Sequence, residues 1–439
     1  MTVETAVTLS PSLALFGFLG VVLLLLVLIA KWKWHVFIAL LVPLLIFGLL
    51  PGIQTNNFIA AFETGFGSTL GSIGVVIVLG SIMSEALRHT GAIKTITRSM
   101  VRLVGAKRMP LALSLSGFVL GIAIFSDVAY VILNPLVHSA ARVMSAPIAV
   151  TATGLVGALQ LTHAIVPPTP GPLAAAAIVG ADIGKTIIYG SLACLVGTLC
   201  GWIWGQYIAG PRIPTLPSMD HADDSYFSPT KEEAASQPPG LMASYAPILV
   251  PVALISAQSL SRLFFEEGHI IRDGLAYIGW PVIALSIGVL LAYRNISTLQ
   301  ERAAARGSWI EEGLKTSAMI LVVTGLGGSL SEILKNTPAV EMMAEMFTHY
   351  QLPVILLPFL IGVIGNMITG STTVGVITAA SIVSPMLESI ALSPEAAMLS
   401  GAAGSIIIKY VNSSYFWVCT SLSGLKVNEA IFAYGGPHC

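Results

Sequence analysis

The sequence predicts an all-α, polytopic membrane protein, and three properties of the chain support this prediction. Of its 439 residues, 55% are apolar and only 10% are charged, against about 25% charged in a typical soluble domain. The mean hydropathy is +0.85. Apolar runs long enough to cross a hydrocarbon layer of about 30 Å recur along the chain. This composition excludes a soluble enzyme. With 21 Lys and Arg against 22 Asp and Glu, the chain has no surplus positive charge for binding nucleic acid.

The apolar runs, taken in order, are the expected spans. Leu13–Ala30 is followed by Lys31 and not by a small-residue cleavage site, so we expect a permanent span and no signal peptide. The other long runs are Trp34–Leu50, Leu70–Leu87, Leu111–Phe125, Ile148–Val166, Ile187–Ala209, Pro247–Phe264, Ala276–Tyr293, Thr316–Leu334 and Leu352–Ile368. Shorter or interrupted runs are Val128–Val143, Pro172–Val179, Val374–Ile390, Ala396–Ile408 and Tyr415–Leu425. Because several runs are broken, the exact number of spans stays open.

Basic residues are distributed unevenly among the loops, and this bias predicts the orientation of the spans. The segment before Leu13 holds Glu4 and no Lys or Arg, so we expect the N-terminus outside. Residues 88–110 form the most basic loop and residues 294–307 carry Arg294, Arg302 and Arg306, so both loops are expected in the cytoplasm.

A single polar linker divides the chain. Residues 211–240 are rich in proline and acids, and we expect them to be cytoplasmic. The predicted organisation is therefore a first half at residues 1–210, the linker at 211–240, and a second half at 241–439.

The two halves resemble each other, which predicts an internal repeat. Residues 63–65 (Glu-Thr-Gly) open a Gly/Ser-rich apolar segment that closes with SEALRHT at residues 84–90. Residues 311–313 (Glu-Glu-Gly) open a similar segment that closes with SEILKNT at residues 331–337. The loop charges send the first segment inward and the second outward, so the repeats are inverted. Inverted repeats with broken helices are typical of secondary transporters.

Each predicted repeat contains two polar breaks at membrane depth. In the first half they are FSD at residues 125–127 and VPPTPGP at 166–172. In the second half they are GNMITGSTT at residues 365–373 and YVNSS at 410–414. Irregular backbone inside a bilayer persists only where protein or a water-filled cavity surrounds it. The free N–H groups of half-helix N-termini suit a carboxylate ligand, so we expect the binding site at these breaks.

Four motifs in order resemble the bacterial gluconate permease family. They are GFGSTLGSIGVVIVLGSIMSEALRHTGA (Gly65–Ala92), FSDVAYVILNPLV (Phe125–Val137), THAIVPPTPGPLAAAA (Thr162–Ala177) and TGSTTVGVITAA (Thr369–Ala380). The resemblance runs from about Leu13 to Phe432 and implies proton-coupled uptake of gluconate-like sugar acids, with some members carrying D-serine. The wider ion-transporter superfamily implies a scaffold domain, a mobile transport domain with two re-entrant hairpins, and a homodimer in the bacterial cytoplasmic membrane.

This chain departs from the family pattern at two places. Gluconate members typically read HGFLPPHPGP where this chain reads HAIVPPTPGP, with Thr169 at the second histidine position. That change puts gluconate itself in doubt as the substrate. The family usually ends with another apolar span, whereas this sequence stops shortly after Phe432, so a C-terminal span is expected to be missing.

Two titratable residues are the candidates for proton coupling. Asp127 lies in an apolar stretch beside a break, where a carboxylate is costly and usually functional. The alternative role for Asp127 is to cap the broken helix or to pair with a base. His163 precedes the proline-rich break and is of a type that titrates near neutral pH. Its alternative is a hydrogen-bonded structural histidine.

The remaining candidates are short polar residues at the breaks, expected to line the substrate site together with Asp127 and His163. They are Ser126, Thr169, Asn366, Thr369, Ser371, Thr372, Thr373, Asn412, Ser413 and Ser414. Glu85 and Glu332, which close the two matched segments, are instead expected to be solvated residues of the membrane interface.

The function expected from these patterns is secondary active import of a small hydroxylated organic anion with a proton, by elevator-type alternating access. No metal motif, nucleotide-binding motif or pair of catalytic residues is visible, so we expect neither an enzyme nor a cofactor. A D-serine-like amino-acid carrier, another hydroxy-acid carrier, sodium coupling and a channel stay open as alternatives.

Overall fold

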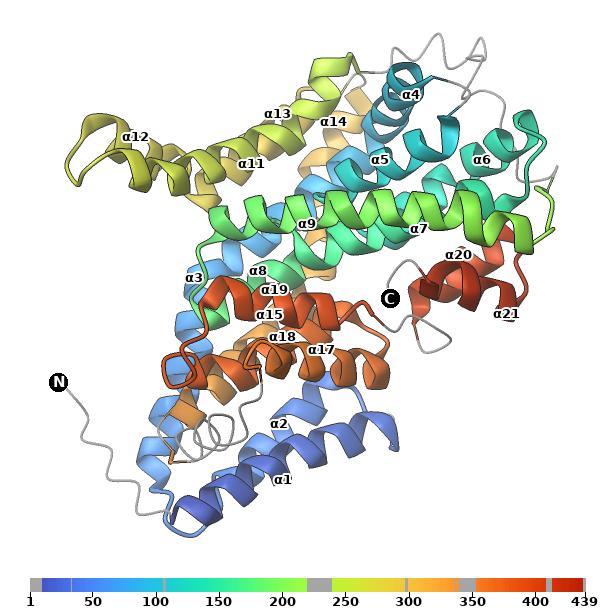
Figure 1. Cartoon of the computed structure of the whole chain (residues 1–439). Helices are drawn as coiled ribbons and strands as arrows, with labels where there is room; N and C mark the ends of the chain where they lie inside the picture. Colours follow the sequence, from blue (N-terminus) through green and yellow to red (C-terminus); the bar gives the residue numbers. More distant parts are fainter. Residues whose placement is uncertain are drawn as a thin grey trace. The chain divides into compact units, whose positions relative to one another are not determined.

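The computed structural model (Figure 1) describes residues 10–32, 34–105, 108–218, 239–296, 299–335, 337–338, 353–407 and 413–436. Every regular element in these ranges is a helix. The chain forms two compact units, and each draws on both sequence halves. Unit 1 comprises residues Met1–Val75, Pro170–Asp182 and Ser317–Ser405. Unit 2 comprises Val76–Thr169, Ile183–Thr316 and Ile406–Cys439.

Unit 1 contains helices from three separate stretches of the chain. Its elements are α1 (Pro11–Ala30), α2 (Val36–Phe47), the first part of α3 (Thr55–His89), α8 (Pro170–Val179), the later part of α15 (Ser308–Lys335), α17 (Leu356–Thr369), α18 (Thr372–Val383), η5 (Ser384–Met386) and α19 (Pro394–Gly404). Leu44 and Phe47 of α2 and Leu330 of α15 belong to one buried apolar cluster, which joins α1, α2 and α15.

Unit 2 is organised around α7 (Ile148–Ile165), whose residues are almost all buried. Around it pack α5 (Met109–Gly121), α6 (Ser126–Val143) and α9 (Ile183–Ile203). The other elements are the later part of α3, α4 (Ala92–Val104), η2 (Trp204–Ala209), η3 (Gly210–Arg212), α11 (Leu241–Phe264), α12 (Ile270–Ile278), α13 (Pro281–Tyr293), α14 (Leu299–Arg306), the start of α15, α20 (Ser414–Ser423), α21 (Val427–Ala430) and η6 (Ile431–Gly435).

The long helices α3 and α15 approach each other at glycines. Within unit 1, a methyl group on Gly65 would lie 2.7 Å from the Cα of Ser329 and against the backbone of Gly328. The Ser329 hydroxyl donates a hydrogen bond to the Phe62 carbonyl across the same contact, over 2.8 Å. Within unit 2, a methyl group on Gly313 would lie 3.0 Å from the backbone nitrogen of Ile82. Small residues allow helices in membranes to pack at this close distance.

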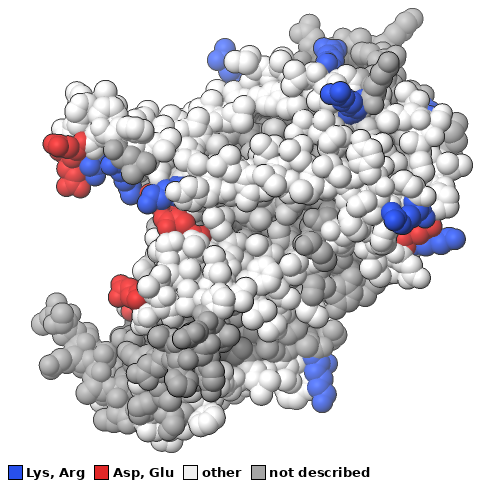
Figure 2. Space-filling view, viewed as in Figure 1, with Lys and Arg blue, Asp and Glu red and all other residues white. Residues whose placement is uncertain are grey.

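Most predicted apolar runs coincide with helices. Among the described residues, five helices are long and apolar enough to cross a membrane, or six if one bent pair counts as a span. Figure 2 agrees with this picture, because most of the described surface on the face shown carries no charged side chain.

One predicted apolar run does not form a single continuous helix. The run Ala276–Tyr293 divides into α12 and α13, which meet at an angle of 59°. Pro281 at the start of α13 has no N–H to continue the hydrogen bonds of α12. A methyl group on Gly279 would lie 2.5 Å from the carbonyl oxygen of Leu254, so α11 approaches the chain closely at this bend.

The chain passes between the two units five times in the described division. It passes within α3 after Val75 and within α15 after Thr316. It also passes after Thr169, between α7 and α8, and after Ser405, between α19 and α20. The remaining crossing, after Asp182, precedes α9.

Candidate functional site

In unit 2, the candidate residues begin at the turn between α5 and α6. α5 ends at Gly121 and α6 starts at Ser126, which is buried and donates a long hydrogen bond of 3.4 Å to Oε1 of Gln160 on α7. Asp127 is exposed in the first turn of α6, and its Oδ1 accepts a hydrogen bond of 2.9 Å from the backbone N–H of Val128. A carboxylate at this position is favoured by the helix dipole.

His163 lies on α7 beside this turn. Its side chain is buried, and its ring centroid is 5.4 Å from that of Phe125, the last residue of the turn. Gln160 lies three residues earlier on the same face of α7 and is also buried. The structure therefore brings Ser126 and His163 to one face of α7, with Gln160 between them in sequence. Sequence reasoning missed Gln160, for which the three-residue spacing from His163 was a weak signal.

The break after α7 is short and internally bonded. The Thr169 hydroxyl is buried and donates to the Val166 carbonyl over 2.7 Å. Pro167 and Pro168 cannot donate backbone hydrogen bonds, so α7 cannot continue through them. The chain then enters unit 1 at Pro170, where α8 begins.

In unit 1, the candidates gather at the turn between α17 and α18. α17 ends at Thr369 and is capped by Gly370, whose φ of +71° is a left-handed conformation that glycine adopts without strain. Ser371 caps α18, because its hydroxyl accepts from the backbone N–H of Val374 over 3.3 Å. The Thr369 hydroxyl accepts from the Ser371 N–H over 3.1 Å and donates to the Gly365 carbonyl over 2.8 Å.

Further polar groups of unit 1 lie at the same turn. Asn366 is buried one turn before Gly370, and Thr372 is buried at the start of α18. The start of α8 also reaches this place, because a methyl group on Gly171 would lie 3.2 Å from the hydroxyl oxygen of Thr373. The turn thus concentrates hydroxyl and amide groups and contains no charged side chain.

The fourth predicted break lies at the edge of the described ranges. Ser413 is buried and precedes α20 as its N-terminal cap residue. Ser414 is the first residue of α20, and Asn412 lies outside the described residues. Among the described residues, no three His, Cys, Asp or Glu side chains are grouped as metal ligands.

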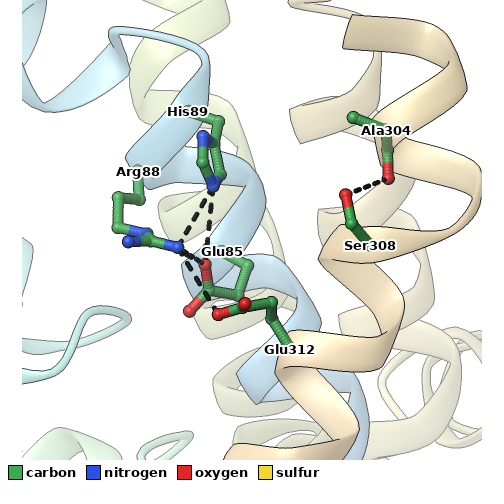
Figure 3. A network of polar contacts seen from close by, with 6 residues as sticks. All are labelled: Glu85, Arg88, His89, Ala304, Ser308 and Glu312. Atoms are coloured by element: carbon green, nitrogen blue, oxygen red, sulfur yellow. Dashed lines mark hydrogen bonds and ion pairs between the residues drawn. The ribbon is translucent and has the colours of Figure 1, made fainter.

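Glu85 lies in a polar network of unit 2, and its burial differs from what the sequence predicted. The prediction of a solvated interface residue is wrong, because Glu85 is only 8% exposed. The guanidinium of Arg88 donates to Oε2 of Glu85 over 2.6 and 2.9 Å, and Glu312 of α15 lies 3.8 Å from the same guanidinium (Figure 3). His89 stacks on Trp309 of α15, with ring centroids 4.9 Å apart. Ion pairing explains the burial of the acid and joins the end of α3 to the start of α15.

A second polar cluster attaches the C-terminal helices to α6. The Tyr130 hydroxyl lies 2.5 Å from that of Ser423, which lies 2.6 Å from the Tyr434 hydroxyl, and all three side chains are buried. His138 contacts the Leu422 carbonyl through Nε2 over 2.9 Å and accepts from the Ser218 N–H through Nδ1 over 3.0 Å. Because backbone groups contact both ring nitrogens, His138 is assigned a structural role.

Comparison with known proteins gives a consistent result over nearly the whole chain. Residues 13–437 match the model of the GntP family of permeases. The gluconate permease of Pseudomonas aeruginosa is 30% identical over 92% of this chain and 90% of its own length. The D-serine transporter DsdX of Escherichia coli is 30% identical over 94% of this chain and 92% of its own length. The solved YdaH transporter of Alcanivorax borkumensis shares the fold, with a TM-score of 0.59 at 16% identity over 97% of this chain and 96% of that chain.

Proposed function

The chain belongs to the GntP family of permeases, which are multi-pass membrane transporters and not enzymes, and on this basis we propose that it imports a small hydroxylated organic anion with a proton. Gluconate-like sugar acids are the proposed substrate class, in agreement with the gluconate permease among the relatives. The proposed setting is a homodimer in the bacterial cytoplasmic membrane with its N-terminus outside.

One observation supports this proposal most: the two helix–turn–helix segments carry different chemistry. The α5–α6 turn ends in an exposed carboxylate at Asp127, while the α17–α18 turn presents hydroxyl groups from Ser371 and Thr373. A carboxylate can carry the coupling proton, and neutral hydroxyls with free N–H groups of a helix start can bind a substrate carboxylate. We assign proton coupling to Asp127 and His163 and substrate binding to the wider set of break residues predicted above.

Alternating access is proposed to be of the elevator type, with the two halves acting as inverted repeats. The support is topological, since the chain passes between the units within α3 and within α15, the two helices of the predicted repeat, and at the helix breaks after Thr169 and Ser405. The segments α5–α6 and α17–α18 are proposed as the re-entrant hairpins. A relative that transports D-serine makes an amino-acid substrate the second candidate, with Asp127 as acceptor for the ammonium group.

Uptake into proteoliposomes tests this proposal. Labelled sugar acids, hydroxy acids and D-serine are offered under an inward proton gradient or an inward sodium gradient. We expect one sugar acid to accumulate with protons alone. Asp127→Asn should abolish this accumulation, whereas Glu85→Gln, which changes a buried but ion-paired acid, should retain it.

Each other outcome has a definite meaning. Accumulation driven by sodium alone would overturn proton coupling and leave the substrate class intact. Accumulation of D-serine and of no sugar acid would establish the second candidate. No uptake of any compound by a folded preparation would refute the substrate class.

A further inference from the structure

A small cavity lies in unit 2, where α13 ends and α14 ends. It has a volume of about 420 Å³ and is lined by Tyr293, Arg294, Ile296, Ala305 and Arg306. Arg294 is the C-terminal cap residue of α13, and Arg306 is the last residue of α14. Two short segments that are not adjacent in sequence therefore each place one arginine at the cavity.

The described lining of this cavity is positively charged. Among the described residues, it contains two guanidinium groups and no acidic side chain. Within the part of the chain that the structure describes, neither Arg294 nor Arg306 has an ion pair or a hydrogen bond from its side chain. Two other arginines of this unit are neutralised, since Arg88 pairs with Glu85 and Arg272 pairs with Glu267. Two guanidinium groups that line one cavity are suited to a phosphate, whose oxygens accept several of their N–H groups at once.

The position of the cavity along the chain favours a lipid headgroup as the source of that phosphate. α13 is apolar from Pro281 to its end, and Leu290 on its last turn is 68% exposed, as a residue facing lipid would be. α14, with the sequence LQERAAAR, is polar. The cavity thus lies where an apolar helix gives way to polar chain, which is the level of the lipid headgroups. Basic pockets at this level typically bind anionic headgroups.

We propose that the Arg294–Arg306 cavity binds the phosphate of an anionic membrane phospholipid. The floor of the cavity is apolar, with Ile296 and Ala305 buried, and can accept the glycerol end of the headgroup. No part of this proposal depends on the transported substrate.

The cavity is also connected to the network of Figure 3. The Tyr293 hydroxyl donates to the Ala305 carbonyl over 2.8 Å, which joins the ends of α13 and α14. The Tyr293 ring meets Trp309 edge-on at 6.2 Å, and Trp309 stacks on His89. A bound headgroup is therefore expected to stabilise the junction of α13, α14, α15 and α3 as one body.

The test compares lipid retention and thermal stability in nanodiscs. Full-length protein is placed in phosphatidylcholine alone or in phosphatidylcholine with phosphatidylglycerol, and bound lipid is counted by native mass spectrometry. The variant Arg294→Gln/Arg306→Gln is compared with Arg102→Gln/Arg212→Gln, which removes the same charge from exposed arginines outside the cavity. Both variants alter exposed side chains, so both are expected to fold.

We expect wild type to retain phosphatidylglycerol and to gain thermal stability from it, and the cavity variant to lose roughly half of that gain or more. Equal loss in the control variant would overturn the cavity as the site, because only general charge would matter. Equal stabilisation by phosphatidylcholine alone would overturn anion recognition. Competition by millimolar inorganic phosphate or glycerol phosphate would overturn the lipid as source and assign the cavity to a soluble phosphate.

Discussion

The turns α5–α6 and α17–α18 both carry residues that were predicted to line the substrate site, yet the polar groups of the two turns differ. Asp127 follows the first turn as an exposed carboxylate whose described bond is to its own neighbour's N–H. The second turn closes through Gly370 and through the hydroxyls of Thr369 and Ser371, which satisfy the local backbone. A proton carrier must change charge, whereas a binding turn must keep its shape. Under the proposed function, the carboxylate of the first turn therefore suits proton coupling, and the neutral hydroxyls of the second turn suit substrate binding.

The largest expected effect separates coupling from binding. A monovalent anion moving with one proton is electrically neutral, so a gradient of about one pH unit, worth about 1.4 kcal/mol, supports about tenfold accumulation. Asp127→Asn should reduce this ratio to about onefold while leaving substrate exchange across a vesicle without a gradient intact. Loss of exchange as well would mean that Asp127 binds substrate, and the contrast between the turns would fail.

Asp273→Asn provides the matched control for that experiment. Asp273 is likewise an exposed acid in the first turn of a helix, α12, but it lies at none of the predicted breaks. The substitution Asp273→Asn should leave the accumulation ratio unchanged.

A smaller effect is expected in the second turn. Ser371→Ala removes a helix cap and should cost about 1 kcal/mol of stability. It should also raise the KM by about twofold to twelvefold, the equivalent of one hydrogen bond of roughly 0.5–1.5 kcal/mol, because the capping hydroxyl still has a proton to donate.

Ser393→Ala shows which part of that result is structural. Ser393 caps α19 in the same way, accepting from the Ala396 N–H over 3.3 Å. Thermal unfolding should shift alike in both variants, and uptake kinetics should change in Ser371→Ala alone. A raised KM in both would reduce the role of Ser371 to capping.

The smallest effect is expected at Ser126. Its bond to Gln160 is long, at 3.4 Å, so Ser126→Ala should change the free energy of unfolding by no more than about 0.5 kcal/mol. Thermal unfolding and KM measured side by side would show this. A strong rise in KM with unchanged stability would instead place the α5–α6 turn among the substrate contacts.

Much of the helix arrangement was predictable, because apolar length and proline positions act locally. The runs Leu13–Ala30 and Ile148–Val166 match α1 and α7 within two residues at each end. The bend before Pro281 was missed, since it depends on the close approach of α11 at Gly279. Glu85 was misjudged for a similar reason. Its burial follows from Arg88 and from the start of α15, which is more than 200 residues away in sequence.

The residues of the candidate site were only partly predictable. Short polar residues beside proline and glycine marked the breaks, and the structure gathers Thr369, Ser371 and Thr373 at one turn. Gln160 was missed because a lone amide inside an apolar run carries little signal without its partner, Ser126.

The touching backbones of α3 and α15 also set how this protein can diversify. Gly65 and Gly328 leave no volume for even one methyl group, whereas Gly67 and Gly71 on the same helix have nothing within 4 Å. Natural variants should therefore retain glycine at positions 65 and 328 and accept alanine at positions 67 and 71. The contacting faces of the two helices are expected to change little among homologues, whereas the open face of α3 is expected to vary.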